Sequence, residues 1–233
     1  MKICLDPRRV IGTIIWVSGA LVALHGIVWG AVFLLGADPQ AFWVELFDLD
    51  HERNIPTLFS SLLLLGCAAL FGVEGLMARR DSEPGGIWHG LGAIFVFLAV
   101  DETAGFHEAL VPPLRRALRA SGLLRPTWVL VYGGALLILG IVCWRWFGRL
   151  PGLLRRQFLL AAALYLAGTL VIEMLGGLKH TLYADDSPPL TSVLCALEEG
   201  LEMAGLIVLM RALLGHLRAK GGVCLSLASR PPK

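Results

Sequence analysis

Two short segments of the sequence hold carboxylates and an imidazole at spacings that suit a shared chemical site. They are Asp101-Glu-Thr-Ala-Gly-Phe-His-Glu108 and Glu198-Glu-Gly-Leu-Glu202, with the patterns DExxxxHE and EExxE. In a helix, residues three, four or seven apart lie on one face, so Asp101 and Glu108 are expected one above the other, and the acids of the second segment point into one sector. Carboxylates and imidazoles that converge from several helices are ligands for zinc or for a pair of iron or manganese ions.

A third acidic segment lies just before Pro56, a residue type favoured in the first turn of a helix. In it Asp48, His51 and Glu52 fall at offsets of three and four, which is one face if this turn is helical. In a plain loop the same charges would only be solvated. The segment joins the candidate site because it is expected at the same end of the molecule as the other two.

These segments supply a candidate set of site residues. Metal ligands are expected among Asp101, Glu102, His107, Glu199, Glu202 and His51, with Asp48, Glu52 and Glu173 as possible additional ligands. Glu108 or Glu198 is the candidate general base. We expect a divalent metal, zinc or iron. The Glu-x-x-His pattern of di-metal sites in helical bundles is absent from the sequence, so the identity and number of the metal ions stay open.

The composition indicates that lipid surrounds the elements that carry these residues. Of the 233 residues 56% are hydrophobic and 16% are charged, whereas about a quarter of the residues of a soluble domain are charged. We predict an all-α polytopic membrane protein, one domain over residues 1–233 built as a bundle of six transmembrane helices. The spans are expected at about 10–36, 56–77, 87–107, 127–147, 157–177 and 190–210, followed by a cytoplasmic tail at 211–233.

The distribution of Lys and Arg sets the expected orientation. Most of them lie in the amino terminus, the loops after the second and fourth spans and the tail. The positive-inside rule then places both termini in the cytoplasm, with the bacterial inner membrane as the expected location. One outer loop departs from this pattern because it carries Arg115, Arg116, Arg119 and Arg125. Their spacing predicts an interfacial amphipathic helix, in which Arg115, Arg116 and Arg119 would bind a lipid headgroup phosphate.

Most acids fall on the opposite, outer side of this map. At about 1.5 Å of rise per residue, Asp101, Glu173 and Glu202 are expected at similar depths below the outer boundary. Several ionised acids in lipid are costly, so protons, nearby Arg and His residues or a metal cation must neutralise them. Protonated or paired acids that only hold helices together are the structural alternative. Away from this cluster, Glu74 is expected to snorkel to the cytoplasmic interface, and His25 to be a packing histidine.

Other classes of function lack support in the sequence. The 20 Lys and Arg residues nearly balance the 18 Asp and Glu residues, which argues against a nucleic-acid partner. The five cysteines stand apart and make a disulfide framework improbable. No nucleotide-binding loop, nucleophile-elbow or HExxH motif is present.

The DExxxxHE segment, the Asn54-Ile-Pro-Thr57 entrance of the second span and the stretch Glu198-Glu-Gly-Leu-Glu-Met-Ala-Gly205 together resemble a group of uncharacterised bacterial multi-pass membrane proteins. The resemblance covers most of the chain. It implies that the three motifs belong together, and it implies no activity.

Two functions remain open. The first is a membrane-embedded metal-dependent enzyme that hydrolyses or oxidises a lipid or another membrane-borne substrate at the outer-leaflet end of the bundle. The second is a cation- or proton-coupled transporter that uses the same carboxylates. The lipid bilayer is the expected partner in both cases, and the oligomeric state stays open.

Overall fold

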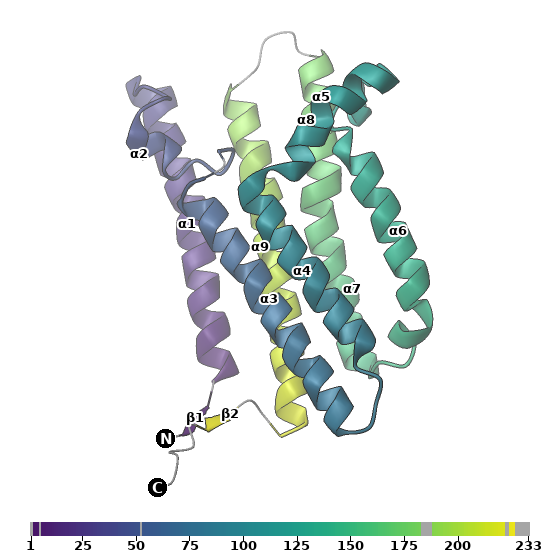
Figure 1. Ribbon diagram of the computed structural model, residues 1–233. Helices are drawn as coiled ribbons and strands as arrows, with labels where there is room; N and C mark the ends of the chain where they lie inside the picture. The colour runs from purple at the N-terminus through teal and green to yellow at the C-terminus, as the bar shows by residue number, and fades with distance from the viewer. Residues whose placement is uncertain (1, 5, 52, 183–187, 222–223, 227–233) are drawn as a thin grey trace, which may run out of the picture.

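The computed structural model describes residues 2–4, 6–51, 53–182, 188–221 and 224–226, and this part of the chain is a bundle of long helices (Figure 1). The expectation of an all-α fold is confirmed apart from one pair of three-residue strands, β1 (Lys2–Cys4) and β2 (Cys224–Ser226). The helical elements are α1 (Pro7–Leu35), α2 (Phe42–Glu45), α3 (Ile55–Arg80), α4 (Gly86–Ala104), α5 (Phe106–Leu118), the short 3₁₀ helix η1 (Gly122–Leu124), α6 (Trp128–Phe147), α7 (Gly152–Leu166), the π-helical η2 (Ala167–Ile172), α8 (Glu173–Leu182) and α9 (Pro188–Ala219).

Five helical segments are long and apolar enough to cross a membrane, which is compatible with a membrane protein. They are α1, α3, α4, α6 and the continuous stretch Gly152–Leu182. Many large apolar side chains of α1 and α6 are exposed, including Trp16 at 81% and Ile141 at 70%. α9 has 32 residues but is not one of the five, so six spans remain a prediction. Its central segment carries the acids of the EExxE motif, and these lower its hydropathy.

α9 packs against α1, α3, α7 and η2, and it extends further than expected. It runs to Ala219 instead of ending near residue 210. Leu213, Leu214 and Leu217 are each at most 4% exposed and belong to the main apolar core. Residues 211–219 are therefore part of the bundle, and a tail can begin only after them.

Both ends of the described chain lie at the same end of the bundle (Figure 1). β1 pairs with β2 in antiparallel register, with Ile3 opposite Leu225. α2 and α5 lie at the opposite end (Figure 1). An even number of crossings is consistent with this arrangement, and the side of the membrane on which the termini lie remains a prediction.

The third predicted span is shorter than expected because a glycine ends it. α4 stops at Ala104, and Gly105 has a φ of 64°, a left-handed conformation that glycine adopts without strain. The amide of Gly105 donates to the carbonyl of Asp101 at 2.8 Å, and a new helix, α5, begins at Phe106. The expectation that Asp101 and Glu108 share one helix face is therefore wrong. The break turns the chain so that His107 faces back toward Asp101.

Two glycines allow the stretch from α7 to α8 to pack closely on α9. A Cβ atom on Gly205 would lie 2.8 Å from the carbonyl oxygen of Ala161, and one on Gly168 would lie 2.6 Å from the carbonyl oxygen of Glu198. Both positions exclude any larger residue without backbone movement. This close packing brings the π-helical turn η2 next to the acids of α9.

Candidate functional site

A large cavity with a volume of about 1190 Å³ extends along the bundle from the end where α5 lies. Its lining comes from α3, α4, α5, α6, the stretch α7 to α8, and α9. One part of the lining is polar and acidic. The other part is apolar and aromatic, with Phe71, Phe95, Phe158, Leu206 and Leu209. The cavity is therefore amphipathic, and its volume is slightly above the ~300–1,000 Å³ that small-molecule sites usually occupy.

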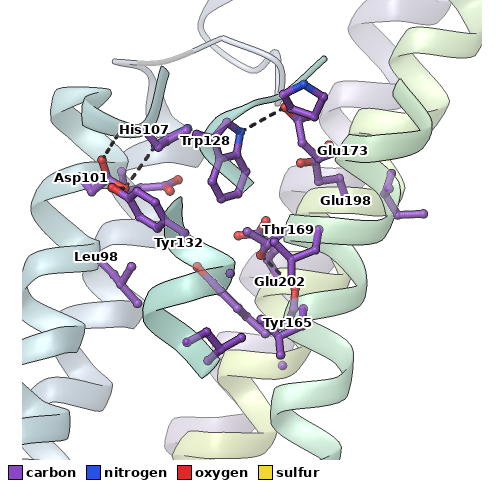
Figure 2. A pocket seen from close by; sticks show the side chains of 18 of the residues that line it. Leu98, Asp101, His107, Trp128, Tyr132, Tyr165, Thr169, Glu173, Glu198 and Glu202 are labelled. Atoms are coloured by element: carbon purple, nitrogen blue, oxygen red, sulfur yellow. Dashed lines mark hydrogen bonds and ion pairs between the residues drawn. The ribbon is translucent and has the colours of Figure 1, made fainter. Parts of the chain in front are cut away.

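The first polar wall is built around Asp101, which is 4% exposed. Its Oδ1 accepts a hydrogen bond from the His107 amide at 3.0 Å, and its Oδ2 lies 3.2 Å from His107 Nδ1. The hydroxyl of Tyr132 donates to the same Oδ2 at 2.9 Å. Figure 2 shows these side chains together on one side of the cavity. Asp101 thus fixes the orientation of His107 and leaves the Nε2 atom of the ring for other partners.

The electrostatic surroundings of His107 make its imidazole a stronger base than an ordinary histidine. Burial lowers the pKa of the imidazole, but the hydrogen bond and negative charge of Asp101 raise it, and the charges of Glu108 and Glu102 raise it further. The net result is a pKa above the ordinary value of histidine. His107 lies on α5, outside the five segments that qualify as membrane spans.

The second polar wall is formed by α9 and the π-helical turn. Glu198, Glu199 and Glu202 line the cavity from α9, as the spacing of the EExxE motif predicts. Thr169 of η2 donates its hydroxyl hydrogen bond to Glu202 Oε1 at 2.9 Å. π-Helical turns are rare and are common at functional sites. Here the turn presents Thr169 to an acid of the neighbouring helix.

Trp128 links the two walls. Its Nε1 donates to Glu173 Oε1 at 3.4 Å, a contact between α6 and α8 (Figure 2). The ring centroid of Trp128 lies 5.2 Å from that of His107 and 5.4 Å from that of Tyr132, in edge-on arrangements. The indole therefore contacts the first wall and holds an acid near the second.

Basic groups occur at the outer rim of the same cavity. Arg115 lines it and donates from Nε to the carbonyl of Arg125 at 3.3 Å. Arg116 and Arg119 are exposed and are not part of the lining. The predicted helix in this loop is present as α5, which ends at Leu118 with Arg119 as its C-terminal cap. Headgroup binding by Arg115, Arg116 and Arg119 remains a prediction, and of these three only Arg115 lines the cavity.

The cavity brings together most of the residues singled out from the sequence. Those in its lining are Asp101, Glu102, His107, Glu108, Glu173, Glu198, Glu199, Glu202, His51 and Arg115. His51 is at the edge, with a side chain that is 59% exposed and 4.0 Å from Glu45. Glu52 lies outside the described residues.

Asp48 is not part of the cavity lining and has a structural role. It is 5% exposed, and its Oδ1 accepts hydrogen bonds from Trp29 Nε1 at 3.0 Å and from the Asp50 amide at 3.1 Å. Burial raises its pKa, but the neighbouring His25 ring and the hydrogen bonds from Trp29 and the Asp50 amide outweigh this, so the pKa is lowered. Asp48 therefore holds the loop before α3 against α1.

Asp50, two residues further on, has a raised pKa, because burial and the negative charge of Asp48 both disfavour its ionised form.

Ser192, His25 and Asp48 are arranged like a Ser-His-Asp triad, but the hydrogen bonding argues against catalysis. Ser192 Oγ lies 3.0 Å from His25 Nε2, and Asp48 Oδ1 lies 3.3 Å from His25 Nδ1. However, the Leu49 amide donates to the same Nδ1 at 3.0 Å, so this nitrogen acts as an acceptor. The proton then resides on Nε2, which cannot accept one from a serine hydroxyl. His25 is 1% exposed and links α1 to α9, so the expectation of a packing histidine is confirmed.

The expected metal ligands do not form a metal centre as they are arranged. Within the described parts of the chain, no group of three or more His, Cys, Asp or Glu side chains is positioned to hold a metal ion. His107 is committed to Asp101 on one wall, while Glu199 and Glu202 lie on the other. This donor set does not fit zinc or a di-iron pair, which need three or more converging ligands.

Sequence reasoning missed the aromatic and hydroxyl groups of the site. Trp128, Tyr132, Tyr165 and Thr169 all line the cavity. Trp128 and Tyr132 are four residues apart at the start of α6, a spacing that places both on one helix face. Polar aromatic residues on one face near the outer end of a predicted span were the available signal. The π-helical turn that presents Thr169 has no comparable signal in the sequence.

Comparison with known proteins identifies a family without an assigned function. Neither a curated protein nor a solved structure matches the chain. The family described as a domain of unknown function, DUF8692, matches residues 12–217, and because this match covers most of the chain, the protein belongs to that family.

Proposed function

We propose that the protein is a membrane-embedded enzyme that binds an amphiphilic, membrane-borne substrate and hydrolyses it by acid–base chemistry. One observation carries this proposal: an Asp–His pair and a set of glutamates share a cavity of about 1190 Å³ with an apolar, aromatic compartment. An alkyl or acyl chain fits the apolar part, and the polar part then receives the head of the same molecule.

The arrangement of the first wall supports a general-base role for His107. Its Nδ1 is held by Asp101 at 3.2 Å, which leaves Nε2 to accept a proton from water. The resulting hydroxide bonds to the carbonyl carbon of an ester or amide, and the bond to the leaving group breaks with its electron pair. A carboxyl group of the second wall returns a proton to that leaving group. No metal ion takes part in this scheme.

The test is transfer of oxygen from labelled water. The purified protein is reconstituted in nanodiscs made from a bacterial polar lipid extract and incubated in H₂¹⁸O, and the released acids are analysed by mass spectrometry. We expect ¹⁸O in a released fatty acid with the wild type, and a loss of at least about 100-fold with His107→Gln. His89→Gln is the matched control, because His89 also belongs to the α4–α5 region but does not line the cavity. Equal label with both variants, or none with the wild type, rejects the proposal.

A second candidate, proton- or cation-coupled transport, is favoured by one observation at the other end of the bundle. Glu74 is fully buried there, and its Oε1 lies 2.7 Å from His216 Nδ1. The expectation that Glu74 snorkels is therefore wrong. Trp88 lies between this pair and the cavity, since its ring centroid is 4.8 Å from that of Trp146, a lining residue, and 6.0 Å from that of His216.

Transport predicts proton flux that needs groups at both ends. In liposomes loaded with a pH-sensitive dye, flux that is lost in both Glu202→Gln and Glu74→Gln supports this candidate. Flux no greater than that of protein-free liposomes rejects it.

A further inference from the structure

The cavity lining holds more carboxyl groups than Arg and Lys side chains, and the two kinds lie in different parts of it. Arg and Lys side chains are contributed by Arg115, Arg125 and Lys179, all close to the rim formed by α5, η1 and the end of α8. The carboxyl groups are more numerous and extend further along the helices. They include Asp101, Glu102, Glu173, Glu198, Glu199 and Glu202.

Two of the rim cations donate hydrogen bonds to neutral groups of the rim. Arg115 Nε donates to the carbonyl of Arg125, and Lys179 Nζ donates to Thr191 Oγ1. In the described part of the chain, no Lys, Arg or His side chain lies within ion-pair distance of Glu198 or Glu199. Bound protons or a cationic occupant of the cavity would neutralise these two acids.

Aromatic groups line the cavity on both sides of the space between the two walls, and Tyr165 lies against Glu202 of α9. Trp128 and Tyr132 line the cavity from α6, and Tyr165 lines it from α7 (Figure 2). Aromatic rings attract an ammonium group, more strongly when water is excluded, and they do not attract an anionic head in this way. Carboxyl groups and aromatic rings together are a recognition surface for an organic cation.

The apolar part of the cavity indicates that the rest of the ligand is an alkyl chain. Phe71, Phe158 and Leu209 form one end of the lining, away from the acids. The head of an amphiphile whose alkyl chain occupies this part would then reach the polar part, which holds Asp101 and the α9 glutamates. A phosphate or sulfate attached directly to the chain would meet these carboxyl groups instead of the rim arginines, and like charges would repel it.

We propose that the substrate is an amphiphile whose head carries an ammonium group close to the chain, recognised by the carboxyl groups of α9 and the aromatic residues beside them. This inference rests on the proposed function, because it names the substrate class for the same cavity. It adds charge selectivity, which the proposed hydrolysis does not by itself require.

The experiment compares single-chain probes of equal length and different head. Dodecylamine, dodecanol and dodecyl sulfate are titrated separately onto the wild-type protein in a mild nonionic detergent, and bound probe is counted by native mass spectrometry. We expect the amine to bind at least about tenfold more tightly than the alcohol, and the sulfate to bind weakest. In Glu198→Gln/Glu199→Gln the preference for the amine over the alcohol should fall below about threefold, while alcohol binding is retained.

A matched control and the alternative outcomes keep the two proposals distinguishable. Glu83→Gln removes an exposed carboxylate in the loop after α3, outside the cavity, and should leave the preference unchanged. Equal binding of amine and alcohol, or tightest binding of the sulfate, overturns the ammonium proposal and leaves the amphiphile cavity in place. Binding of none of the three probes overturns the cavity assignment together with the proposed function.

Discussion

Replacing Gly205 with alanine tests the packing that builds the second wall. The added Cβ would lie 2.8 Å from the Ala161 carbonyl oxygen, 2.8 Å from the Tyr165 amide nitrogen and 2.9 Å from Tyr165 Cβ. Two of these three atoms belong to the backbone of α7 and cannot move away as a flexible side chain can. To restore ordinary contact, α7 must move from α9 by roughly half an ångström, a distance that forfeits a sizeable part of the contact energy of the atoms involved.

The expected cost follows from two opposing effects. Overpacking of this kind typically destabilises by about 1–3 kcal/mol, and alanine gains about 0.5–1 kcal/mol over glycine inside a helix. The net loss should be on the order of 1–2 kcal/mol. For a chain of this length that corresponds to a Tm lower by roughly 2–8 °C.

The assay is thermal unfolding in detergent, followed by tryptophan fluorescence, with a control on the same helix. Gly215 also lies on α9, and a Cβ there would have nothing within 4 Å, so Gly215→Ala should leave Tm unchanged or raise it. A Gly205→Ala variant as stable as Gly215→Ala would refute the close packing of α7 on α9. It would also remove the structural reason for placing Thr169 against Glu202.

Three further predictions concern the acids and the histidines. Asp101→Asn removes the negative charge that raises the pKa of His107, so the ring should lose its proton at a lower pH than in the wild type. The titration midpoint is measured by histidine NMR, and an unchanged midpoint would contradict the Asp–His pair. Glu74→Ala leaves His216 and Lys220 without their buried partner. The free energy of unfolding, measured by chemical denaturation, should fall by about 3–5 kcal/mol. A change below about 1 kcal/mol would show that the pair is not buried. Elemental analysis of the purified protein should find no zinc, iron or manganese at one ion per chain, because the expected ligands lie on two separate walls; a stoichiometric metal lost in Glu199→Ala would contradict this arrangement.

Much of the fold is readable from the sequence because lipid requires long apolar helices. The expected spans coincide with helices, and Pro56 does lie in the first turn of α3, which Asn54 caps by accepting from the Thr57 amide at 3.1 Å. The end of α4 was missed because a single glycine in an apolar segment does not show whether it continues a helix or adopts a positive φ, as Gly105 does. The burial of Glu74 was missed for a related reason: its partners come from α9, and pairing between distant segments leaves no local pattern.

The site was predictable as a collection of residues but not as an arrangement. The spacing of Glu198, Glu199 and Glu202 fixes their common direction on one helix, and all three line the cavity. Their distance from His107 depends on how four helices pack, which spacing within a helix does not determine. For this reason the sequence suggested one metal centre, whereas the structure has an Asp–His pair and a glutamate wall on separate sides of a cavity.

The central claim, that an amphiphile occupies this cavity, is tested most directly by mapping where a photoreactive acyl chain attaches to the protein. A lipid with a diazirine at the chain end is incorporated in nanodiscs and irradiated, and the labelled peptides are identified by mass spectrometry. The account predicts labelling near Phe71, Phe158 and Leu209 that an excess of unlabelled lipid of the same class competes away, above a non-saturable background on the exposed faces of α1 and α6. Labelling confined to those exposed faces, with no saturable component inside the cavity, would contradict it.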